Sequence, residues 1–166
     1  MQKSHYETQN AGHHLNIILI AENIRTPENV GMMMRLSEAF GVREIFFAGE
    51  KAVDFTTKVK RASRNTYKTV QYTFNSDAEF ELERLKKEGY RSIALEITEK
   101  SKSIHHFENS NVDRIAIIVG SERQGVSDKV LNLCEEHFHI PMYGQNSSIN
   151  VVNALSIGFY KITESL

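Results

Sequence analysis

Two long apolar runs constrain this chain more than any other feature of its sequence. Leu15 to Ala21 reads LNIILIA, and Arg114 to Val119 reads RIAIIV. Continuous β-branched runs of this length are typical of strands that are buried on both faces, as in parallel sheets covered by helices. The two runs therefore predict a mainly parallel sheet with helices on both faces.

Strand-like and helix-like segments alternate along the rest of the chain. The predicted strands are residues 15–21, 44–48, 70–74, 91–98, 114–119 and 137–140, and the predicted helices are 27–40, 77–88, 127–134 and 149–162. Thr26 is expected to cap the first helix, and Phe80, Leu82 and Leu85 are expected to face the core. This alternation predicts an α/β fold in a single domain spanning residues 1–166, with residues 1–14 as a flexible lead-in.

Charge and composition exclude some classes of protein and leave others open. With 25% charged residues, 40% hydrophobic residues and a net charge of -1, the chain has a globular composition and no overall attraction to nucleic acid. A local basic segment from Lys51 to Lys68 includes Lys60, Arg61 and Arg64. This segment is either a solvated surface or a patch that contacts RNA phosphates.

The cysteine and histidine residues predict a reducing environment and no metal site. Cys134 has no partner for an internal disulfide and lies among apolar neighbours, which favours a packed thiol in the cytoplasm. His105 and His106 are interpreted as surface residues, and the histidines before Leu15 lack other ligands at metal-binding spacing. No segment is apolar enough to span a membrane or to act as a signal peptide.

A glycine loop and a polar cluster are the candidates for a ligand site. Residues 120–125 (GSERQG) follow a predicted strand, but Val126 stands where a phosphate-binding loop needs lysine, and the spacing does not fit dinucleotide binding. Downstream, Ser147, Ser148 and Asn150 lie at the start of the last predicted helix, which Ser148 is expected to cap. Because ligands bind beyond the carboxyl ends of parallel strands, these segments are expected to converge.

Three blocks of residues resemble the SPOUT superfamily of knotted methyltransferases, in particular its TrmH-like ribose 2′-O-methyltransferases of RNA. They are NVGMMMR at 29–35 followed by FGV at 40–42, IVGSERQGVS at 118–127, and IPMYG at 140–144 followed by SINV at 148–151 and Ala154. The resemblance spans both ends of the chain. It implies a C-terminal trefoil knot, which general rules of topology would not predict.

The same resemblance implies a cofactor and an oligomeric state. S-adenosylmethionine would bind in the knot, and the protein would be a homodimer that packs its first and last helices across a two-fold axis. The cofactor-binding residues implied in this way are Leu95, Glu96, Gly120, Ile140, Met142, Ser148 and Ile149.

The resemblance also assigns catalytic roles. Arg35 would act on the proton of the 2′-hydroxyl or on the adjacent phosphate. Because a guanidinium is a poor base near neutral pH, we favour positioning and stabilisation of the developing alkoxide over removal of the proton. Asn29 and Asn150 would orient Arg35 or the ribose, Glu122 would hold the loop or a catalytic residue, and Ser148 would shape the cofactor site. Arg35 is expected to come from the other subunit.

The substrate implied by the resemblance is RNA, with tRNA preferred because the short chain is similar to the branch that methylates the wobble nucleotide. Ribosomal RNA stays open as an alternative substrate, and so does methylation of a base instead of the ribose. A non-catalytic knotted factor that binds RNA or assists assembly is a further alternative.

Overall fold

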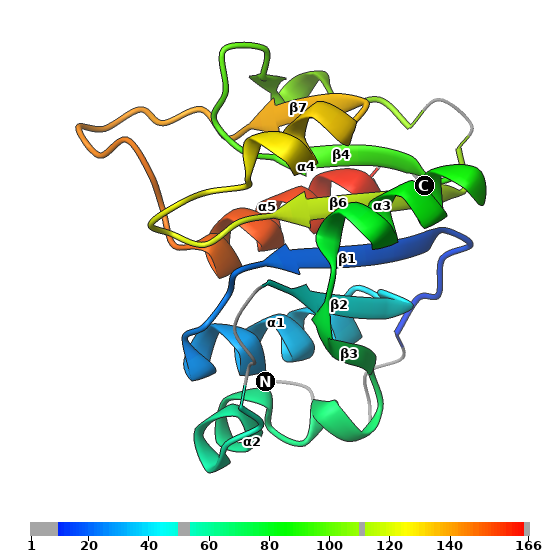
Figure 1. Cartoon of the computed structure of the whole chain (residues 1–166), viewed down its shortest axis with the longest axis vertical. Coiled ribbons are helices and arrows are strands. Elements are labelled where there is room, and N and C mark those ends of the chain that lie inside the picture. The colour runs from blue at the N-terminus through cyan, green and yellow to red at the C-terminus, as the bar shows by residue number, and fades with distance from the viewer. Residues whose placement is uncertain (1–9, 50–53, 110–111, 165–166) are drawn as a thin grey trace, which may run out of the picture.

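The computed structural model describes residues 10–49, 54–109 and 112–164. Within these residues the chain forms a seven-stranded sheet with the order β3-β2-β1-β6-β4-β7-β5, in which all neighbouring strands are parallel (Figure 1). The two apolar runs are the adjacent central strands β1 and β6. The predicted α/β fold with a mainly parallel sheet is confirmed, and its strand order is consistent with the trefoil knot expected from the resemblance.

The elements follow one another in nearly the predicted order. The strands are β1 (Asn16–Glu22), β2 (Glu44–Ala48), β3 (Gln71–Ser76), β4 (Arg91–Leu95), β5 (Lys102–Ser103), β6 (Arg114–Val119) and β7 (Glu136–His139). The α-helices are α1 (Pro27–Ala39), α2 (Thr57–Ser63), α3 (Ala78–Lys87), α4 (Asp128–Leu133) and α5 (Val151–Glu164), and the short 3₁₀ helices are η2 (Thr66–Lys68) and η3 (Ile104–His106).

Both faces of the sheet are buried, as the apolar runs predicted. Along β1, Ile17, Leu19 and Ala21 belong to one hydrophobic core, whereas Ile18 and Ile20 belong to a second core on the opposite face. Helices α1 and α5 contribute to the first core, and α3 and α4 contribute to the second (Figure 1). The sheet therefore lies between two layers of helices.

The region after β4 differs from its prediction. β4 ends at Leu95, earlier than the predicted Thr98, because the chain turns there: the Ser101 backbone N–H donates to the Thr98 carbonyl at 3.1 Å. The chain then forms β5, which the sequence did not predict, and pairs it with β7. This turn leaves the residues after Leu95 free to line a site instead of extending the sheet.

Two details of the helices were predicted wrongly. Phe80 is 64% exposed, because the buried stripe of α3 passes through Ala78, Leu82 and Leu85 and leaves Phe80 on the outer side. The Thr26 side chain makes no capping hydrogen bond, so Pro27 and the acidic residue of the first turn remain the start signals of α1.

The predicted lead-in lies partly outside the described residues, which begin at residue 10. Residues 10–14 form neither helix nor strand, but the His13 Nε2–H donates to the Phe40 carbonyl at 2.8 Å and so fixes this segment to the end of α1. No helix in the described ranges is long and apolar enough to cross a membrane.

Candidate functional site

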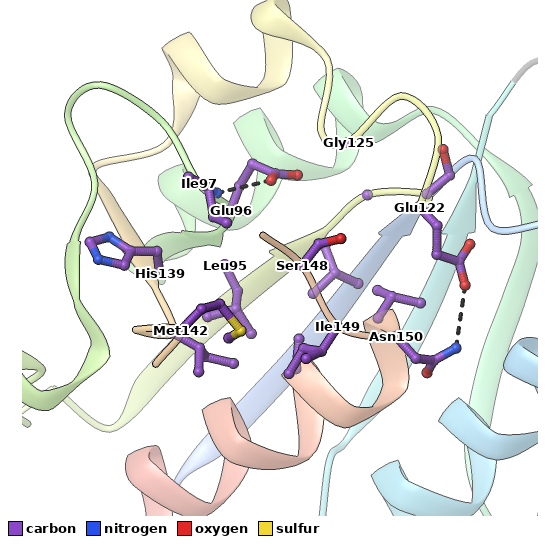
Figure 2. A pocket seen from close by; sticks show the side chains of 16 residues that line it. Leu95, Glu96, Ile97, Glu122, Gly125, His139, Met142, Ser148, Ile149 and Asn150 are labelled. Carbon is purple, nitrogen blue, oxygen red and sulfur yellow. Dashed lines mark hydrogen bonds between the residues drawn. The ribbon is translucent and has the colours of Figure 1, made fainter. Parts of the chain in front are cut away.

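A pocket of about 450 Å³ lies beyond the carboxyl ends of β4, β6 and β7 (Figure 2). Its walls come from three loops, which follow these three strands, and from the start of α5. Ligands of open parallel sheets bind at this edge, and the volume suits a small organic molecule. The pocket is therefore the candidate ligand site of the chain.

Every residue that the resemblance assigned to the cofactor lines this pocket. These seven residues are Leu95, Glu96, Gly120, Ile140, Met142, Ser148 and Ile149. Five other lining residues, Val119, Ser121, Gly125, Val151 and Ala154, lie in the blocks that carry the resemblance but were not assigned to the cofactor. Sequence reasoning missed Ile97 and His139. Each is next to an assigned residue along the chain, and that adjacency is the signal that could have found them.

The pocket walls are mainly apolar, with few side chains that carry charge. The side chains of Leu95, Met142 and Ile149 line the pocket (Figure 2), and Ile140 contributes a further apolar side chain. The charged groups that line it are the carboxylates of Glu96 and Glu122. Such a lining suits a ligand with a flat apolar part and a polar edge that backbone groups can bind.

The glycine loop, defined as residues 120–127, folds back on itself beside the pocket. The Gly125 N–H donates to the Ser121 carbonyl at 2.8 Å, and the two residues form an antiparallel bridge. A Cβ on Gly120 would lie 2.0 Å from the carbonyl carbon of Gly125, so this position excludes any side chain. Gly125 has a φ of +65°, which also favours glycine.

The base of the glycine loop is held by two carboxylates from neighbouring strand ends. Glu96 accepts hydrogen bonds from the backbone N–H groups of Val126 at 3.1 Å and Ile97 at 2.9 Å. Glu22, at the end of β1, accepts from the backbone N–H of Ser127 at 2.8 Å and from its hydroxyl at 2.7 Å. Sequence reasoning missed Glu22 and Ser127 as a pair, because a contact between residues so far apart leaves no local pattern.

Three of the predicted catalytic residues meet in an amide–carboxylate cluster, formed by Asn29, Glu122 and Asn150. The Asn29 Nδ2 donates to Glu122 Oε1, and the Asn150 Nδ2 donates to Asn29 Oδ1 at 3.2 Å. The Asn150 Nδ2 also lies 3.5 Å from Glu122 Oε1 (Figure 2). Asn29 is buried at the start of α1. The cluster thus joins α1, the glycine loop and the start of α5.

The sequence predicted that Ser148 caps the last helix, but the cap is Asn150. The Val152 backbone N–H donates to Asn150 Oδ1 at 2.8 Å, and α5 begins at Val151. Ser148 lies before the helix and lines the pocket instead. Both amide atoms of Asn150 are therefore engaged, because its nitrogen bonds the cluster and its oxygen caps α5.

Arg35 stands apart from the other predicted catalytic residues. Its side chain is exposed on α1, it does not line the pocket, and it forms no hydrogen bond or ion pair with the described residues. Asn29 and Asn150 bond each other and Glu122, so in one chain they do not orient Arg35. A single chain brings together the cofactor residues and the cluster but not the arginine.

A comparison with known families decides how this geometry is to be understood. The model of the SpoU rRNA methylase family matches residues 16–160, which include β1, the glycine loop and most of α5. The chain belongs to the SpoU rRNA methylase family. A Staphylococcus saprophyticus protein assigned to the TrmH family of tRNA/rRNA methyltransferases is 29% identical over 154 residues, covering 93% of this chain and 61% of that protein. The chain thus spans about three fifths of that relative.

Solved structures share the fold of this SpoU family chain. An rRNA methyltransferase from Sinorhizobium meliloti with bound AdoMet matches with a TM-score of 0.83 at 18% identity, over 91% of this chain and 57% of the other. A structure that addresses 2-OH methylation of C/U34 on tRNA matches with a TM-score of 0.78 at 21% identity, over 92% of this chain and 97% of the other. At these identities the likeness establishes the fold.

The basic segment of this SpoU family chain forms a surface on α2 and around it. Lys60, Arg61 and Arg64 are exposed, and the Lys60 Nζ lies 5.4 Å from the centre of the Phe55 ring. A Cβ on Gly31 of α1 would lie 2.5 Å from the Val59 carbonyl oxygen, so the glycine allows α2 to pack closely on α1. Lys51, which the sequence placed in the same segment, lies outside the described residues.

The remaining candidates of the sequence carry no chemistry at the pocket. Burial raises the pKa of the Cys134 thiol to about 12 from its ordinary 9.0, which fits the predicted packed thiol. His105 and His106 are exposed in η3. Among the described residues, no group of three or more potential ligands is arranged to hold a metal ion.

Proposed function

We propose that this protein is an S-adenosylmethionine-dependent methyltransferase that methylates a ribose 2′-hydroxyl of RNA, with tRNA as the preferred substrate. The observation that carries the proposal is the coincidence of the pocket with the residues named by the resemblance, in a chain of the SpoU rRNA methylase family. Membership of the family does not by itself indicate where a methyl donor would bind. The pocket offers a place for the donor, and the cluster offers polar groups beside it.

The pocket fits S-adenosylmethionine by shape and chemistry. Its apolar walls at Ile140, Met142 and Ile149 suit the adenine ring. Because Gly120 and Gly125 have no side chains, the polar edge of the ligand can reach main-chain groups there. The similar Sinorhizobium meliloti enzyme is described with AdoMet bound. When bound, the cofactor supplies a methyl group on a positively charged sulfur.

The residues of the chain would then position the ribose and stabilise its oxygen. The amide–carboxylate cluster lies at the side of the pocket where Glu122 lines it, so a ribose there would be next to the starts of α1 and α5. Arg35, as a cation, would stabilise the alkoxide that develops as the hydroxyl proton passes to water. Alignment and charge stabilisation, not proton removal by arginine, are the catalytic contributions that we propose.

Arg35 reaches the site in this proposal from a second copy of the chain. We propose a homodimer that packs α1 and α5 across a two-fold axis, supported by the exposed apolar side chains of Met32, Ile157 and Tyr160 on these helices. In such a pair, Arg35 of each subunit would serve the pocket of its partner. The exposed position of Arg35 within one chain supports this arrangement.

Two further parts of the proposal rest on the comparisons and on the surface charge. The preference for tRNA is supported by the structure that addresses C/U34 methylation on tRNA, of which this chain covers 97%. Lys60, Arg61 and Arg64 would contact phosphates of the bound RNA. Residues 1–166 are proposed to form a single methyltransferase domain with the trefoil knot in its C-terminal part.

Transfer of a labelled methyl group tests the proposal. The purified protein is incubated with labelled S-adenosylmethionine and, separately, with tRNA and ribosomal RNA from cells that lack the protein, and the products are hydrolysed with alkali. A 2′-O-methyl group blocks cleavage at its phosphate, so the label is expected in a dinucleotide from tRNA. Label in mononucleotides would indicate base methylation, and no transfer to either RNA would favour a non-catalytic RNA-binding factor.

A further inference from the structure

Glu22 is a buried carboxylate for which the proposed chemistry has no direct use. It is the last residue of β1 and is 7% exposed. Its two oxygens accept hydrogen bonds from the same residue, at 2.8 Å from the Ser127 backbone N–H and at 2.7 Å from the Ser127 hydroxyl. A buried carboxylate is costly unless its oxygens are bonded, so this pair fixes Ser127 to the end of β1.

Ser127 is the last residue of the glycine loop, and Glu122 lies at the tip of the same loop. Strands β1 and β6 are paired with Ala21 opposite Val119, so Glu22 lies beside the position where β6 passes into the loop. The bridge between Ser121 and Gly125 closes the loop into a small ring. A displacement of Ser127 would therefore be passed to Glu122 instead of being absorbed by the loop.

Glu96 holds the same loop in a different way. Its carboxylate accepts from Val126 N–H, but it also lines the pocket, so changing it would alter ligand binding as well as the loop. Glu22 does not line the pocket. Its effect on the site can pass through the loop alone.

We propose that Glu22 is a positioning residue, which holds the glycine loop at Ser127 so that Glu122 meets Asn29 and Asn150. This inference rests on the proposed function, because its effect on catalysis is measured as methyl transfer. Loss of the carboxylate leaves a buried N–H without an acceptor, and the loop is expected to move toward solvent to satisfy it. Small displacements of positioning groups lower turnover strongly.

A graded series of variants measures this role. Glu22→Leu removes both acceptors, and it is expected to lower turnover at saturating S-adenosylmethionine about thirtyfold. Because the glycine loop also lines the pocket, the affinity for S-adenosylmethionine is expected to fall as well. Glu22→Gln keeps an oxygen for the Ser127 N–H and is expected to retain at least about a third of the wild-type turnover. Recovery by glutamine would show that hydrogen bonding, and not charge, is what Glu22 contributes.

A matched control is available at the other end of the sheet. Glu44, the first residue of β2, accepts a hydrogen bond from the Thr73 hydroxyl at 3.3 Å, far along the strands from the loop. Glu44→Leu removes a carboxylate–hydroxyl pair that is exposed and far from the loop. It is expected to leave turnover unchanged.

A double-mutant cycle separates positioning from general stability. If Glu22 acts through Glu122, then Glu22→Leu causes no further loss of turnover in a Glu122→Ala background. If Glu22 supports only the fold, the two losses multiply, and that result would overturn the proposal. Should Glu22→Leu fail to fold, Ser127→Ala serves in its place, with an expected loss of about threefold that also disappears in the Glu122→Ala background.

Hydrogen exchange tests the loop without any need for activity. Backbone amides of residues 120–127 are expected to exchange faster in Glu22→Leu than in wild-type protein or in Glu44→Leu. Unchanged exchange in the loop would refute the inference even if the protein proves to be inactive on RNA. Faster exchange without methyl transfer by the wild-type protein would refute the proposed function and leave the contact of Glu22 with the loop in place.

Discussion

A single chain contains the whole pocket, but it does not bring together all the residues that the resemblance assigned to catalysis. All seven residues assigned to the cofactor line one pocket, and three assigned catalytic residues, Asn29, Glu122 and Asn150, meet beside it. Arg35 instead lies exposed on α1, outside the pocket. One chain is therefore equipped to hold a ligand but is short of the cation that the proposed chemistry needs.

The difference teaches that binding and turnover should respond separately to substitution. The pocket is a local product of three neighbouring loops, and its shape depends on close backbone contacts such as the one between Gly120 and Gly125. In our proposal, the catalytic residues are complete only when a second subunit contributes its Arg35. Variants of the pocket should change cofactor affinity, whereas variants of Arg35 should change turnover alone.

Arg35→Ala is expected to have the largest effect. Loss of the cation should lower methyl transfer by roughly a thousandfold, because stabilisation of a developing alkoxide is lost. The dissociation constant for S-adenosylmethionine, measured by calorimetry, should stay within about threefold of the wild-type value because Arg35 does not line the pocket. Retained turnover would remove Arg35 from the mechanism.

Gly120→Ala is expected to have the opposite signature. Its Cβ would lie 2.0 Å from the Gly125 carbonyl carbon, so the loop must move and the pocket must change shape. Cofactor affinity is expected to fall by about a hundredfold, since a close backbone contact is lost. Gly144→Ala is the matched control, because a Cβ there meets nothing within 4 Å, and it should bind the cofactor normally. Equal affinities for both variants would show that the loop does not shape the ligand site.

The basic surface should affect RNA and not the cofactor. Replacing Lys60, Arg61 and Arg64 with glutamine is expected to weaken RNA binding by about tenfold and to reduce the slope of its salt dependence by about two. Neutralising Lys87 and Lys129, on the helices of the other face, is the control. A salt slope that is the same in both variants would identify the α2 surface as solvated and without a role in binding.

The Cys134 thiol should have the smallest effect on function. Because burial raises its pKa to about 12 from 9.0, the folded protein holds this proton more tightly than the unfolded chain. The thiol thus contributes stability that is complete below pH 9 and is lost as the pH rises toward 12. Alkylation at pH 8 should be slow in the folded protein and fast in denaturant, and rapid alkylation of the native protein would contradict the burial.

The sequence predicted the parts of the fold that depend on local pattern. The apolar runs at β1 and β6 gave a sheet buried on both faces, and the structure has the corresponding two cores. The prediction that Phe80 faces the core was wrong, because its spacing also fits the outer side of α3. The β5 strand has two residues, too few for a periodic pattern.

The sequence itself predicted that the glycine loop and the polar cluster before α5 converge, whereas the roles of individual site residues came from the resemblance. Ser148 was expected to cap α5, yet Asn150 does so, because a run of polar residues offers several possible caps and only the backbone decides among them. The pairing of Glu22 with Ser127 joins the end of β1 to the start of α4, which are distant in sequence, so composition and spacing could not reveal it. Contacts between loops require the three-dimensional structure.

Complementation between two variants with strongly reduced turnover tests the central claim most directly. Arg35→Ala and Glu122→Ala chains, carrying different tags, are produced together and the mixed species is purified. If Arg35 serves the pocket of its partner, one of the two sites in the mixed dimer is intact and about half of the wild-type turnover returns. A mixed species with no more turnover than the separate variants, or a failure to form any mixed species, would contradict a site shared between subunits.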